Sequence, residues 1–179
     1  MLIKILIGVV VVVGVFAGIV ALRPSEFRVE RSAVISAPPT VVFAQVNDLH
    51  NWDAWSPWAK LDPAAKQTFE GPPAGTGAAF SWVGNSKVGE GRMTITETRP
   101  YELIRFRLDF VRPFAGTNAA EFTFTPRGDQ TAVTWSMSGR QNFLAKAFCM
   151  FMNMDRMVGG EFEKGLAQMK SVAEAANKT

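Results

Sequence analysis

The strongest pattern in the chain is an apolar stretch over residues 5–22, which carries no charge and is rich in Val, Ile, Leu and Phe. As a helix, its eighteen residues would extend about 27 Å, close to the thickness of a bilayer's hydrocarbon core. Roughly a dozen strongly apolar residues, each favouring insertion by about 0.3 to 0.6 kcal/mol, outweigh the cost of three glycines. Lys4 and Arg23 flank the stretch and can reach the two interfaces. The pattern predicts one membrane-spanning helix.

A cleaved signal peptide is the alternative interpretation of this stretch. Signal peptides usually have an apolar region of about 7–15 residues that ends in a small-residue cleavage site. The sequence Ile19-Val20-Ala21 matches such a site poorly, so we expect residues 1–26 to stay as an anchor with a short linker. Gly14 and Gly18 have the GxxxG spacing that would allow a weak homodimer in the membrane.

Basic residues give a partial indication of which side the soluble part occupies. Lys4 precedes the apolar stretch, and Arg23, Arg28 and Arg31 follow it. The positive-inside rule counts these residues alone. The side stays undetermined from the sequence, with a lean toward the cytoplasm.

After the anchor, the hydrophobic pattern changes to short alternating segments typical of strands. Residues 27–35 are predicted as a first strand, and residues 40–46 and 48–54 as two short helices. Apolar and charged residues then alternate along residues 103–110, as expected of an antiparallel sheet with one buried face. Turn residues separate six later strands, predicted at residues 66–71, 77–83, 88–98, 103–110, 119–126 and 131–138.

The last forty residues have a helical period. Apolar positions recur over residues 143–157 and again beyond Gly159-Gly160, which predicts a long helix with a glycine joint. Such a helix can bury its apolar stripe only by lying across the curved sheet. The sequence therefore predicts one α+β domain over residues 27–179, with about seven strands and a long C-terminal helix.

Composition and charge exclude several classes of function. The net charge of +3 comes from mixed charges without a run of five or six basic residues, so we expect no nucleic-acid partner. Cys149 is the only cysteine and His50 the only histidine, which excludes an internal disulfide, a cysteine-rich zinc cluster and a multi-histidine metal site. No metal or cofactor is indicated.

Four local motifs in this order resemble the START-like SRPBCC superfamily, in its polyketide cyclase/dehydrase branch. They are Ser36-Ala37-Pro38-Pro39-x-Val41-x2-Ala44, Trp55-Ser56-Pro57-Trp58, Trp82-Val83-Gly84-Asn85 followed by Gly91-x-Met93-x-Ile95-x-Glu97, and Phe162-Glu163-Lys164-Gly165-Leu166-Ala167. The resemblance implies a helix-grip (Bet v 1/START-like) fold, in which a curved antiparallel sheet wraps the C-terminal helix around an elongated cavity. Members include lipid carriers, receptors and cyclases, so the resemblance leaves function open.

The apolar positions on the inner face of the sheet and on the helix are candidate ligand-binding residues. Periodicity alone cannot distinguish a filled core from a lined cavity, and most of these side chains are equally expected in an ordinary core. The three tryptophans at residues 52, 55 and 58 would lie at the cavity mouth or at the membrane interface, or else would cap the sheet. The candidates are Trp55, Trp58, Trp82, Met93, Ile95, Phe106, Leu108, Phe122, Phe124, Trp135, Met137, Phe148, Phe151 and Met152.

No convincing catalytic group is present, and Glu97 and His50 are the two weak candidates. Glu97 shares strand parity with Met93 and Ile95 and would point into the cavity, or else would reach solvent or pair with an arginine. His50 has Asp48 and Asp53 nearby in the sequence.

Three functions follow as hypotheses. The first is a membrane-tethered binding domain for a hydrophobic small molecule or lipid. The second is a regulatory protein-interaction module, for which we expect side chains to fill the space between helix and sheet. The third is a cyclase- or dehydrase-type enzyme that uses the same cavity.

Overall fold

Seven antiparallel strands form one curved sheet in the computed structural model, which describes residues 2–150 and 153–178. The strand order is β1-β7-β6-β5-β4-β3-β2, so the chain's first and last strands are neighbours. The strands are β1 (Glu26–Ile35), β2 (Lys66–Glu70), β3 (Ala79–Val83), β4 (Glu90–Arg99), β5 (Leu103–Arg112), β6 (Gly116–Arg127) and β7 (Gln130–Arg140).

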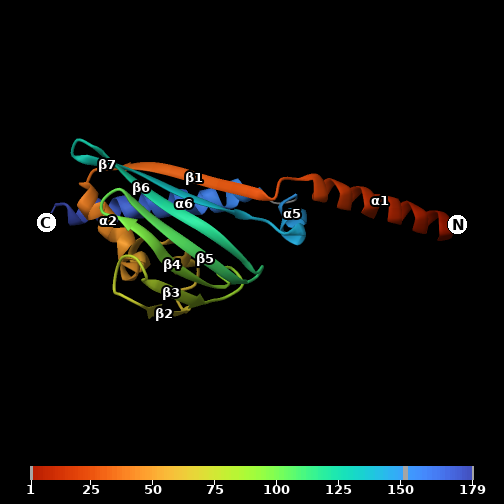
Figure 1. Cartoon of the computed structure of the whole chain (residues 1–179), viewed down its shortest axis with the longest axis horizontal. Helices are drawn as coiled ribbons and strands as arrows, with labels where there is room; N and C mark the ends of the chain where they lie inside the picture. The colour runs from red at the N-terminus through yellow and green to blue at the C-terminus, as the bar shows by residue number, and fades with distance from the viewer. Residues whose placement is uncertain (1, 151–152, 179) are drawn as a thin grey trace.

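The helices divide into an N-terminal helix that projects from the body and others that pack on or beside the sheet (Figure 1). The long C-terminal helix runs along the concave side of the sheet, and its end lies opposite the projecting helix (Figure 1). They are α1 (Leu2–Leu22), α2 (Pro39–Asn47), the 3-10 helix η1 (Leu49–Asn51), α3 (Trp52–Trp55), α4 (Pro57–Leu61), α5 (Phe143–Cys149) and α6 (Met154–Ala176).

This arrangement confirms the predicted fold class. The sheet is antiparallel, α6 lies across it, and one apolar helix precedes the domain. Among the described residues, α1 alone is long and apolar enough to span a membrane, a property that signal sequences share. Only Arg23, Pro24 and Ser25 separate α1 from β1.

The predicted position of the glycine joint is wrong. Residues Gly159 and Gly160 lie inside the continuous helix α6, and the break falls earlier, between α5 and α6. Asn153 caps the new helix by accepting a hydrogen bond from the backbone N–H of Arg156 at 3.0 Å. The cap residue, and not the glycine pair, sets where the helix begins.

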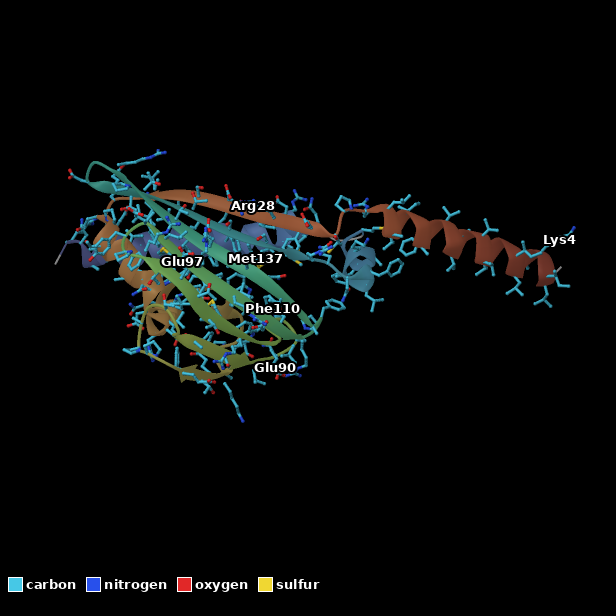
Figure 2. The ribbon with its side chains drawn as sticks, viewed as in Figure 1. Lys4, Arg28, Glu90, Glu97, Phe110 and Met137 are labelled. Atoms are coloured by element: carbon cyan, nitrogen blue, oxygen red, sulfur yellow. The ribbon has the colours of Figure 1, made fainter. Side chains whose placement is uncertain are left out.

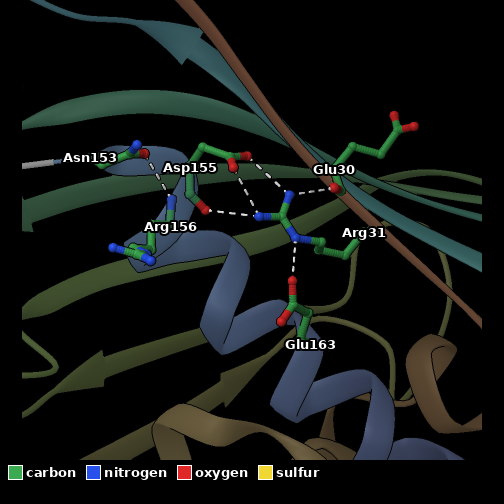
Figure 3. A network of polar contacts seen from close by, with 6 residues as sticks. All are labelled: Glu30, Arg31, Asn153, Asp155, Arg156 and Glu163. Atoms are coloured by element: carbon green, nitrogen blue, oxygen red, sulfur yellow. Dashed lines mark hydrogen bonds and ion pairs between the residues drawn. The ribbon is translucent and has the colours of Figure 1, made fainter.

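Gly159 instead makes room for Arg31, which joins β1 to α6 (Figure 3). The guanidinium donates hydrogen bonds to Asp155 at 3.0 Å and to Glu163 at 2.6 Å. Because residues 155, 159 and 163 are four apart, they share one helix face, and the arginine lies along it. A Cβ atom at position 159 would collide with that guanidinium, whereas one at Gly160 would meet nothing within 4 Å.

We expect Gly159→Ala and Gly160→Ala to have opposite effects on stability. Gly160→Ala should raise the free energy of unfolding by about 0.5–1 kcal/mol, because alanine is the better helix former. Gly159→Ala should lower it, since the added methyl group displaces Arg31. Denaturant unfolding of the full chain, followed by tryptophan fluorescence, measures both. Destabilisation by Gly160→Ala would instead indicate a flexible glycine joint.

The same cluster predicts a pH dependence of stability. Hydrogen bonds from Arg31, and then its charge, hold the pKa of Asp155 below its usual range. A lowered folded-state pKa stabilises the protein above the unfolded value near pH 4, and this contribution is lost as pH falls through the folded value. The difference in melting temperature between wild type and Asp155→Asn should therefore be largest near neutrality and shrink on acidification. A difference that is constant over the whole range would contradict this role.

Candidate ligand-binding cavity

A cavity of about 240 Å³ lies between the sheet and helices α3, α4 and α6. It exceeds the roughly 150 Å³ that holds a benzene molecule in an engineered protein core. It is smaller than the pockets of about 300–1,000 Å³ that enclose drug-sized ligands. Its wall consists of Trp52, Asp53, Ser56, Trp58, Ala59, Asp62, Ala65, Gln67, Phe80, Trp82, Val88, Met93, Leu108, Phe110, Ala120, Trp135, Met137, Val158 and Phe162.

The space between helix and sheet is divided into a cavity and a packed core. On β4, Met93 lines the cavity, whereas Ile95 on the same face is 1% exposed and lies in the core. On β5, Leu108 lines the cavity and Phe106 lies in the core. On both strands, the cavity residue is the one nearer the β3–β4 and β5–β6 turns.

The same division holds along β6, β7 and α6. Ala120 lines the cavity, while Phe122 and Phe124 are buried in the core. Trp135 and Met137 line the cavity, and Val133 does not. Strand β1 begins beside the end of β7, immediately after α1. The cavity therefore occupies the end of the domain nearer α1, where Phe110 and Met137 lie closer to α1 than Glu97 does (Figure 2).

Trp135 forms the inner wall where cavity and core meet. Its indole stacks on Phe162 of α6 at 4.0 Å between ring centroids and on Phe122 at 4.7 Å. Trp55 and Trp58 approach it edge-on at 5.7 Å and 5.6 Å. Each such aromatic pair contributes about 0.5–1.5 kcal/mol beyond its area burial, so these contacts stabilise the wall.

Two glycines allow rings to approach the backbone at the wall. A Cβ at Gly165 of α6 would lie 2.9 Å from the Trp135 ring and 3.1 Å from Pro57. A Cβ at Gly91 of β4 would lie 2.6 Å from the ring of Trp82, the residue opposite it on β3. The motifs that contain these glycines thus shape the cavity.

The polar part of the wall is acidic. Asp53 accepts a hydrogen bond from the Gln67 side chain at 3.0 Å, and Asp62 accepts one from the backbone N–H of Asn85 at 2.7 Å. Ser56 is 7% exposed and adds a hydroxyl group. Among the described wall residues there is no Lys, Arg or His. A ligand group that meets this part of the wall therefore encounters hydrogen-bond acceptors.

The structure places the fourteen predicted ligand-binding residues in four settings. Six lie on the cavity wall, namely Trp58, Trp82, Met93, Leu108, Trp135 and Met137. Five are buried in the core, namely Trp55, Ile95, Phe106, Phe122 and Phe124. Phe148 lies on α5, is 44% exposed and is not on this wall. Phe151 and Met152 lie outside the described residues.

Glu97, one of the two weak catalytic candidates, lies away from the cavity. A register shift between Ile95 and Glu97 inserts Thr96 as a bulge and turns Glu97 to the outer face. There it accepts a hydrogen bond from Arg105 at 2.6 Å and pairs with Arg99. The parity with Ile95 is broken by the bulge.

His50, the other candidate, contributes to a separate hollow of about 80 Å³. Its Nδ1 lies 2.9 Å from a carboxylate oxygen of Asp48, and its ring stacks on Phe69 at 4.1 Å. The side chain is 55% exposed. His50 is therefore a surface residue whose ring is positioned by Asp48 and Phe69.

Sequence reasoning missed much of the wall. Phe110 has the same parity as Leu108, and Phe162 lies on the apolar stripe of α6, so both had a detectable signal. Asp53 and Asp62 had none, because they come from short helical turns and a loop that carry no periodicity.

Comparison with known proteins identifies related sequences and folds. Residues 26–174 match the family described as polyketide cyclase / dehydrase and lipid transport. A protein from Nitrosospira multiformis is 18% identical, with a TM-score of 0.60 over 86% of this chain and 100% of that chain. TTHA0849 from Thermus thermophilus is 16% identical, with a TM-score of 0.60 over 84% of this chain and 99% of that chain.

A further solved structure, Ara h 8.0201, is 10% identical, with a TM-score of 0.54 over 84% of this chain and 99% of that chain. No curated protein matches the sequence. At these identities the structural likeness shows the fold alone.

Alanine substitutions at two phenylalanines of β5 should distinguish the core from the cavity wall by their effects on the free energy of unfolding. Phe106→Ala should lower the free energy of unfolding by about 3–5 kcal/mol, because Phe106 is fully packed. Phe110→Ala should cost less than half as much, because Phe110 borders empty space and is partly exposed. Urea unfolding of the full chain measures both values. Equal losses would mean that the cavity is filled in solution.

Proposed function

Since the chain belongs to the polyketide cyclase/dehydrase and lipid transport family, we propose that it is a membrane-tethered binding protein for a small hydrophobic molecule. The observation that carries this proposal is the apolar cavity of about 240 Å³ at the end of the domain nearer α1. A pure protein-interaction module is expected to have this space filled by side chains, so the open cavity favours binding. His50 and Glu97, the catalytic candidates, lie outside the cavity wall.

The tether forms part of the proposed function. α1 has the length and composition of a single span, and the linker of three residues keeps the domain at the bilayer surface. The excess of basic residues after α1 favours the cytoplasmic side. A Cβ at Gly14 or Gly18 would meet nothing within 4 Å, so this face is open in the single chain, and a weak homodimer through it stays a prediction.

The wall chemistry narrows the ligand class. An apolar body would contact the aromatic and methionine side chains, which adapt to varied shapes. Asp53 and Asp62 would accept hydrogen bonds from a hydroxyl or amine and would repel a carboxylate or phosphate. We therefore expect a single-chain or ring-containing molecule whose polar group is neutral or cationic.

Adjacent alanines on β6 provide a matched test of binding. Ala120 faces the cavity, whereas Ala119 is exposed on the other face of the strand. Decyl chains that carry bromine and end in a hydroxyl, an amine or a carboxylate would be added to the full chain in lipid nanodiscs. All five tryptophans lie outside α1, so bromine quenching of their emission reports entry into the domain.

The alcohol and amine should quench strongly and the carboxylate weakly. Ala120→Leu should abolish most of the quenching because the larger side chain fills the cavity, while Ala119→Leu should leave it unchanged. Equal quenching in both variants would contradict binding in this cavity. Strong quenching by the carboxylate would contradict the ligand class alone.

A further inference from the structure

Helix α5 and the turn between β5 and β6 expose large apolar side chains beside the end of α1. These residues are far apart in the sequence but lie on the same end of the domain as α1 (Figure 1). We call them the apical face. Its members are Phe114, Phe143, Leu144 and Phe148, with exposures of 45%, 46%, 68% and 44%.

Hydrogen bonds fix α5 at the level where α1 ends. The Lys146 ammonium donates to the backbone carbonyls of Ala21 and Arg23, each at 3.1 Å. The backbone N–H of Gln141 donates to the carbonyl of Ser25 at 2.7 Å. Val20, in the last turn of α1, is fully buried, although most of that helix is exposed. Hydrogen bonds therefore join the end of α1 and its linker to the domain at this point.

Helix α5 is amphipathic, and the apical face continues from it onto the β5–β6 turn. Residues 143, 144 and 148 fall within about 140° around a helix, on one side of α5. Cys149 and Lys146 lie on the other side, where Cys149 accepts a hydrogen bond from the Gln141 side chain at 3.2 Å. The ring of Phe148 lies 5.6 Å from that of Phe114, so the helix and the β5–β6 turn present one surface.

We propose that the apical face is a second membrane contact, which inserts into the interface of the bilayer that α1 spans. This inference rests on the tether in the proposed function, because α1 fixes the depth of the face. Residues 21–23 mark the point at which a span of residues 5–22 leaves the hydrocarbon, and α5 is hydrogen-bonded to that point. Apolar side chains at this level are buried by lipid, as in amphipathic interfacial helices.

Because the apical face lies next to the end of α1, the bilayer is a better candidate for covering it than a protein partner. A protein that covers this face would have to lie within the headgroup layer around α1, which lipid already occupies. Arg23 and Lys146 add positive charge at the same level and favour anionic lipid. The contact would hold the cavity end of the domain against the lipid.

Depth-dependent quenching of a label tests this proposal on the full chain. The background is Cys149→Ala, and single cysteines carry an environment-sensitive nitrobenzoxadiazole label. Leu144→Cys reports on the apical face, Asp129→Cys on the exposed β6–β7 turn at the opposite end, and Val12→Cys on the middle of α1. The protein is reconstituted in vesicles of phosphatidylcholine and phosphatidylglycerol that contain lipid spin-labelled near the headgroup or deep in the chain.

The label at position 144 should emit at shorter wavelength than the label at 129, and headgroup-region spin labels should quench it several-fold more strongly. The label at 12 should be quenched best by deep spin labels. Quenching at 12 with a water-exposed label at 144 would overturn the second contact and leave the tether intact. Absence of quenching at 12 would overturn the tether itself.

A triple variant, Phe143→Ser with Leu144→Ser and Phe148→Ser, gives an independent readout. It should increase the accessibility of a label placed at Phe114→Cys to a water-soluble quencher. An unchanged accessibility at position 114 would mean that α5 does not hold this end against lipid, and would overturn the proposal.

Discussion

The stack of Trp135 on Phe162 is the contact on which the arrangement of this domain depends. It joins β7, the strand beside the edge strand β1, to α6, and Gly165 lets the helix approach closely enough for the rings to lie 4.0 Å apart. On one side of the stack, Phe122, Leu166 and Met169 are buried in the packed core. On the other side, a cavity remains between the helix and the sheet. A single aromatic contact thus fixes both the spacing of the two layers and the inner boundary of the cavity.

Arg31 secures the other end of the same helix. Its bonds to Asp155 and Glu163 hold the first turns of α6 against β1, near the cavity residue Val158. The pairs are exposed and each contributes little stability alone. Their effect is positional, because they fix the part of α6 that carries the cavity residue Val158. The cavity is therefore held open between an aromatic contact and a charged one.

The hydrophobic pattern predicted the fold well and the site only in part. Alternation along β5 and the helical period of α6 are local signals, so the sheet and the helix that lies across it followed from them. Met93 and Ile95 have the same parity, yet only Met93 lines the cavity, because what covers each of them comes from elements distant in the sequence. For Glu97, the alternation of inner and outer positions along β4 gave the wrong face, because a bulge shifts the register after Ile95.

The glycine pair resembles a joint in sequence because Arg31, the partner of Gly159, is distant along the chain. Contacts between residues so far apart in the sequence do not change the local hydrophobic period, so the pattern cannot predict them.

The short connection at Arg23, Pro24 and Ser25 also limits the reach of the protein. Helix α6 has 23 residues and extends about 35 Å, running away from α1 toward the far end of the domain (Figure 1). If α1 spans a bilayer, the domain can contact only molecules within about one length of α6 from the bilayer surface. Delivery to a second, distant membrane would then be excluded by geometry. Exchange would be confined to lateral diffusion in one plane, where encounter rates depend on surface density instead of bulk concentration.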